Sequence, residues 1–116
     1  MMSTKKTDVD QTLTEEGKEK ICIYIGKIYM RARRRIDIYE IARCVRENQK
    51  CYDNDQQFVR MIDRSLEDCT PDTRKIIRKE FLEMQNTLWY MDFYSKSTYY
   101  RLRRRAIDEF IQCLNL

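Results

Sequence analysis

The chain has 116 residues, with two glycines, one proline and no histidine. This scarcity of turn-forming residues excludes folds of many short strands, and 42% apolar with 36% charged residues suits amphipathic helices better than disorder. We predict an all-α fold of five to six helices in one compact bundle. A flexible N-terminal tail is expected over residues 1–13, and a single helical domain over residues 14–116.

The residue types that several common sites require are missing from the chain. Without a histidine or a glycine-rich phosphate loop, we expect no catalytic residues, no cofactor and no enzymatic activity. The five cysteines form no Cys-x-x-Cys pair, so we expect no metal site but small buried thiols in a reducing, cytoplasmic compartment. No apolar run reaches the roughly 20 residues of a membrane span, so no membrane partner is expected.

Helical periodicity begins near Glu15, after a possible N-cap at Thr14, and continues to about Arg35. The stripe expected to pack on the core is Ile21, Tyr24, Ile25, Ile28 and Ala32. A second stripe beside it is cationic and contains Lys20, Lys27, Arg31 and Arg34. Gly26 interrupts the pattern and predicts a close approach by another helix.

Two further helices are expected before residue 70. Asp37 can cap a helix that runs to about Gln49, with a buried face of Ile38, Ile41, Ala42 and Val45. A polar connection over residues 50–54 then leads into a helix over residues 55–68. Its expected inward side chains are Phe58, Met61, Ile62, Ser65 and Leu66.

The C-terminal part contains the clearest start signals. Thr70 followed by Pro71 predicts an N-cap and a first helical residue, and this fourth helix is expected to end near residues 85–86. A short fifth helix is expected from there through Phe93. Ser95 can cap the last helix, whose core stripe is Tyr99, Leu102, Ala106, Phe110 and Cys113, widened by Ile107 and Leu114.

The outward face of this last helix has the residue types that a DNA reader needs. Arginine can bind guanine edges or phosphates, and Ser, Thr and Tyr hydroxyls suit either. We predict that the DNA-binding residues are Lys96, Ser97, Thr98, Tyr100, Arg101, Arg103, Arg104 and Arg105. Of these, Arg103 and Arg105 are expected at the flanks, near phosphates.

The run SKSTYYRLRRRAIDEF (residues 95–110) resembles the recognition helix of the sigma-factor region-four helix-turn-helix. It is most similar to phage transcriptional regulators of the ArpU kind, and the C-terminal part also resembles small uncharacterised proteins of mollicutes. Upstream, TPDTRKIIRKEFLE (residues 70–83) is similar to the helix that precedes the motif in that family. The resemblance implies a helix-turn-helix over about residues 70–115, double-stranded DNA as the partner, and RNA polymerase or a second copy of the chain as further partners.

Two departures from the family pattern keep another interpretation open. The link from Leu82 to Ser95 is shorter than usual, and Phe93 stands where a glycine with positive φ is common, which predicts strain. The alternative function is therefore a helical protein–protein interaction module with a degenerate helix-turn-helix. The aromatic residues near the turn also allow binding of single-stranded RNA, although we expect most of them in the core and Tyr100 exposed.

A second acid-free segment lies in the N-terminal half. Residues 27–35 contain Lys27, Arg31, Arg33, Arg34 and Arg35. These side chains can add phosphate contacts, or they can belong to an ordinary solvated helix end. The net charge of +4 is small, so the positions of the cations matter more than their sum.

Overall fold

The computed structural model describes residues 13–83 and 88–115. In that part of the chain the fold is all-helical, as predicted, with four α-helices and no strand. They are α2 (Glu15–Ile41), α3 (Gln49–Glu67), α4 (Pro71–Ile77) and α5 (Lys96–Cys113). Three shorter helical segments link them: η1 (Arg46–Asn48), the π-helical η2 (Arg78–Leu82) and η3 (Trp89–Asp92). None of the described helices is long and apolar enough to cross a membrane.

The predicted boundary between the first two helices is wrong. Residues 15–41 form one helix, and Asp37 lies within it instead of capping a new one. The chain turns at Arg43, whose φ of 55° ends the helix. The predicted connection over residues 50–54 is likewise part of α3. The expected buried face of a separate helix is therefore absent, and Ile41 is 82% exposed.

The side of α2 that packs on the core is rotated by about one residue from the expected stripe. Its buried residues are Cys22, Gly26, Tyr29 and Ala32, whereas Tyr24 is 66% exposed. Gly26 sets this rotation, because a Cβ there would lie 2.0 Å from the carbonyl oxygen of Phe81 in η2. The predicted close approach at Gly26 is thus confirmed, and η2 is the element that approaches.

The start signals of the C-terminal helices are confirmed. Thr70 is the N-cap residue of α4 with Pro71 in its first turn, and Ser95 caps α5. The expected end of the fourth helix and the start of the fifth fall on residues 84–87, outside the described residues. On α5, Tyr99, Ala106 and Phe110 are buried as predicted, and all three belong to the main core cluster.

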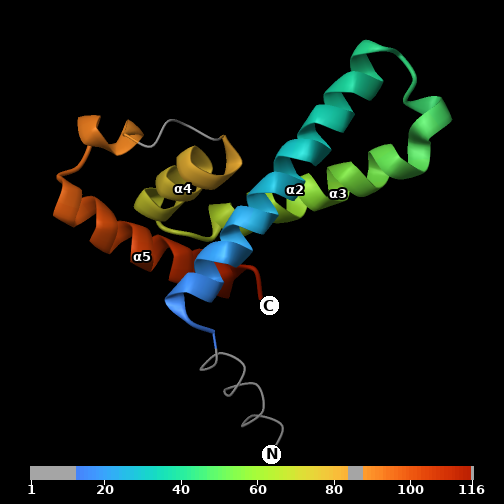
Figure 1. The fold of residues 1–116 in the computed structure, drawn as a ribbon. Coiled ribbons are helices and arrows are strands. Elements are labelled where there is room, and N and C mark those ends of the chain that lie inside the picture. The colour runs from blue at the N-terminus through green and yellow to red at the C-terminus, as the bar shows by residue number, and fades with distance from the viewer. Residues whose placement is uncertain (1–12, 84–87, 116) are drawn as a thin grey trace, which may run out of the picture.

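The molecule is flatter and more extended than the compact bundle we expected. The Cα radius of gyration is 16.4 Å, compared with about 13 Å for a compact chain of this length. Figure 1 shows the reason: the far ends of α2 and α3 project as a hairpin away from the part formed by α4 and α5. In this projection, residues 33–54, no side chain is fully buried.

Candidate nucleic-acid interface

The turn before α5 is relaxed, contrary to expectation. Phe93 has a φ of −122°, so this bulky residue does not occupy the left-handed region and carries no strain there. The hydroxyl of Tyr94 donates a 2.8 Å hydrogen bond to Asp72 of α4. Ser95 then accepts a hydrogen bond from the backbone N–H of Thr98, which starts the helix without a glycine.

Aromatic side chains pack beneath this turn. The rings of Tyr90 and Tyr99 are stacked with centroids 3.8 Å apart, and Trp89 meets Tyr99 edge-on at 5.7 Å. All three residues are buried, whereas Tyr100 is 52% exposed. The aromatic cluster therefore fixes η3 against α5, as expected, and leaves Tyr100 available at the surface.

Most of the predicted DNA-binding residues lie on the exposed side of α5. Lys96, Ser97, Arg101 and Arg105 are all exposed. The three cations among them form no ion pair with any described residue. Thr98 is half-buried and its hydroxyl receives a hydrogen bond from Ser95, so it belongs to the cap of the helix.

Arg104 is also exposed but has a partner. Its Nε lies 3.2 Å from a carboxylate oxygen of Glu15, and both side chains are 66% exposed. An ion pair in such contact with water contributes little stability, typically below about 1 kcal/mol. A phosphate group can therefore displace Glu15 at small cost.

Arg103 does not lie where we predicted it. Its guanidinium donates hydrogen bonds to Glu80 of η2 at 2.7 Å and to Glu19 of α2 at 2.8 Å, and the side chain is only 20% exposed. Burial alone would lower the pKa of Arg103, but these hydrogen bonds raise it overall. Arg103 lies four residues after Tyr99 and four before Ile107, both buried, so the helix directs it inward. Arg103 is therefore a structural cation, and its guanidinium is not available for contact with a phosphate.

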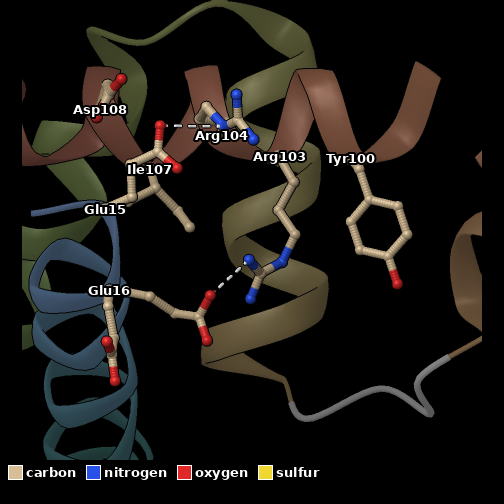
Figure 2. A pocket seen from close by; sticks show the side chains of 8 residues that line it. Glu15, Glu16, Tyr100, Arg103, Arg104, Ile107 and Asp108 are labelled. Carbon is tan, nitrogen blue, oxygen red and sulfur yellow. Dashed lines mark hydrogen bonds and ion pairs between the residues drawn. The ribbon is translucent and has the colours of Figure 1, made fainter. Parts of the chain in front are cut away.

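A cleft of about 370 Å³ separates the first turns of α2 from α5 (Figure 2). Ile107 and Tyr100 supply its apolar surface. Its charged lining consists of Glu15, Glu16, Glu19, Asp108, Arg103 and Arg104. Acidic side chains in the first turns of α2 stabilise the N-terminal end of that helix. Two of them, Glu15 and Glu19, also pair with Arg104 and Arg103 of α5.

Sequence reasoning missed the carboxylates that hold Arg103. Glu80 and Glu19 are 23 and 84 residues away in the chain, so no helical spacing links either of them to this arginine. The only available signal was angular position on the helix, because Arg103 falls within the core stripe of α5 rather than opposite it.

The described residues show no cluster of metal ligands. No group of three or more His, Cys, Asp or Glu side chains in this part of the chain could hold a metal ion. Burial raises the pKa of the Cys22 and Cys69 thiols to about 12, so both stay protonated at neutral pH.

Comparisons with known proteins identified no relatives: no protein family, no curated protein and no solved structure matches this chain.

Proposed function

We propose that this protein is a cytoplasmic DNA-binding protein that presents α5 to duplex DNA, and that it acts in transcriptional regulation. The observation that carries the proposal is the outward face of α5. Residues 96–107 contain no acid, and Lys96, Arg101 and Arg105 are exposed without an ion pair among the described residues. Cations in this state are available to phosphates and to guanine edges.

The local structure supports the same function. Ser95 caps α5, and the exposed Ser97, Tyr100 and Arg101 follow within its first two turns. Helix-turn-helix proteins contact bases with this part of the recognition helix. We assign base contacts to Ser97, Tyr100 and Arg101, and phosphate contacts to Lys96, Arg104 and Arg105.

One observation favours the alternative, a protein-interaction module. Among the described residues, the element before the turn is a single short 3-10 segment, η3, instead of a full positioning helix. Met91 of this segment and Phe93, which follows it, are more than half exposed, and such apolar side chains suit a protein partner. RNA polymerase and a second copy of the chain remain candidate partners under either function.

The test is DNA binding measured across salt concentrations. A pool of randomised duplexes first selects a preferred sequence, and the slope of log affinity against log salt is then determined for it. The variant Arg101→Gln/Arg104→Gln should lose affinity through both contacts and reduce the slope by about 0.9, because each lost phosphate contact contributes about 0.9 and Arg104 is the phosphate contact of the two. Arg46→Gln/Lys50→Gln, which removes two exposed cations from the hairpin, is the control with equal charge change.

Two results would count against the proposal. Absence of salt-dependent binding to any duplex would refute it and favour the interaction module. Equal losses in the α5 variant and in the hairpin control would show that net charge alone, rather than α5, attracts the DNA.

A further inference from the structure

The second cationic segment, residues 27–35, is divided by the structure into two groups. Arg35 donates two hydrogen bonds of 2.8 Å to the buried Asp55 of α3. The guanidinium of Arg33 lies 5.9 Å from the centre of the Tyr29 ring, and its Nη1 donates to the Tyr29 hydroxyl at 3.4 Å. These two arginines therefore serve the hairpin itself.

The other three cations, Lys27, Arg31 and Arg34, have no such role. All are exposed, and none forms an ion pair with a residue in the described ranges. Their spacing of four and three residues places them on one side of α2, over about 10 Å of helix. This side is opposite the residues that α2 buries, which are Cys22, Gly26, Tyr29 and Ala32. We call these three cations the α2 ridge.

The charge around the ridge differs from that of an ordinary solvated helix. Residues 20–36 contain no acid at all, so α2 has no carboxylate along this length to offset the ridge. The chain has 23 cationic and 19 acidic side chains. Without the three cations of the ridge and the four exposed cations of α5 (Lys96, Arg101, Arg104 and Arg105), 16 cationic side chains would remain, fewer than the 19 acidic ones. The positive excess of the protein is therefore concentrated on two helices.

We propose that the α2 ridge is a second DNA contact, which binds the phosphate backbone outside the bases read by α5. This inference rests on the proposed function of α5. Lys27 and Arg31 lie where α2 packs on the core, and Arg34 lies at the start of the projecting residues 33–54. All three side chains are exposed, so a long rigid polyanion can reach them. Three cations on a rigid helix, without side chains that read bases, suit sequence-independent phosphate binding.

The same observations favour DNA over an anionic membrane. A helix that lies in a membrane surface inserts an apolar face beside its cations. Over the length of the ridge, the apolar face of α2 is already buried against the protein core at Tyr29 and Ala32. Between Lys27 and Arg34 the ridge therefore offers mainly charge to its partner, whereas the exposed Tyr24 and Ile38 lie just beyond its two ends.

The experiment uses the full chain with the substitutions Lys27→Gln, Arg31→Gln and Arg34→Gln. The control, Arg46→Gln/Lys50→Gln/Arg60→Gln, removes three exposed cations from η1 and α3. We expect the ridge variant to bind DNA at least tenfold more weakly than the wild type near 0.1 M salt. The slope of log affinity against log salt should fall by about 2.7, and both effects should be much smaller in the control. The preference for the selected duplex over a scrambled one should be unchanged, because phosphate contacts position DNA without reading it.

Each outcome has a defined meaning. If the ridge variant matches the control while the α5 variant still loses affinity, the ridge inference fails and the proposed function stands. If the ridge variant loses affinity while the α5 variant matches its control, the ridge contact is supported and the role of α5 fails. If the ridge variant loses binding only to vesicles containing phosphatidylserine and not to DNA, the ridge inference is overturned in favour of a membrane partner.

Discussion

Two segments of this protein look alike in sequence and differ in the structure. Residues 27–35 and 96–105 each contain five cations and no acid. In the first segment, Arg35 pairs with the buried Asp55 and joins the two helices of the projecting hairpin. In the second, Arg103 pairs with both Glu19 and Glu80 and joins α5 to α2 and η2 at the core. The two segments thus share a composition but stabilise different parts of the fold.

The comparison shows that a linear count of cations overstates what is available to a partner. Each residue of a helix is rotated by about 100° from the one before, so the five cations of one segment point in several directions. Arg35, Arg103 and Arg104 meet carboxylates of other helices, whereas the other exposed cations of the two segments form no ion pair with a described residue. Each segment therefore combines structural cations with cations that can bind a ligand.

The largest expected effect separates these two kinds of cation on α5. Arg103→Ala should lower the free energy of unfolding by about 3 kcal/mol, because Glu80 would be left poorly solvated and without its partner. Arg101→Ala should change it by less than about 0.5 kcal/mol. Urea unfolding of both variants measures the difference. Equal stabilities would show that Arg103 is not a structural cation.

The corresponding pair on α2 should show a smaller difference. Arg35→Ala should cost about 2 kcal/mol, because the two charge-assisted hydrogen bonds to the buried Asp55 are lost. Arg31→Ala should leave the stability nearly unchanged. Amide hydrogen exchange should also show faster opening of the hairpin in the Arg35 variant than in the Arg31 variant. If exchange accelerates equally throughout the protein, the effect of Arg35 is not confined to the hairpin.

A smaller effect tests whether Glu15 competes with DNA for Arg104. Glu15→Gln should raise the affinity for DNA by about two- to fivefold, since the exposed pair contributes below about 1 kcal/mol. Glu16→Gln is the matched control, because Glu16 lies in the same cleft but pairs with Lys20. The excess gain over this control should disappear when Arg104 is replaced by Ala. A gain that persists without Arg104 would reflect general charge removal instead.

The smallest expected effect concerns Glu109, which follows the second segment. Burial alone would raise the pKa of Glu109, but hydrogen bonds from Thr73 and Thr70 and the charge of Arg105 lower it overall. A lowered pKa contributes stability above the pKa of the unfolded chain, about 4.3, and this is lost as the pH falls through the folded value. The stability advantage of the wild type over Glu109→Gln should therefore shrink between pH 5 and pH 3. Urea unfolding at both pH values would detect it, and a constant difference would contradict it.

Local signals in the sequence were sufficient for some elements and not for others. Thr70-Pro71 and Ser95 marked the starts of α4 and α5 correctly, because capping depends on residues next to each other in the chain. The predicted helix start at Asp37 was wrong, because Asp favours N-caps but is also tolerated inside a helix, where α2 holds it. The helical spacing of Ile38 and Ile41 predicted burial, but both side chains are more than half exposed.

The sequence by itself determined that the chain is helical, where α4 and α5 begin, and which faces of its helices are cationic. These properties follow from hydrophobic periodicity, capping and charge, which act over a few residues. Only the tertiary structure decided which cations form ion pairs within the fold and which remain exposed to a partner. Arg103 and Arg35 meet carboxylates from distant parts of the chain, and such pairs form only when packing brings the helices together. The exact rotation of α2 was decided in the same way, by the contact between Gly26 and the backbone of Phe81.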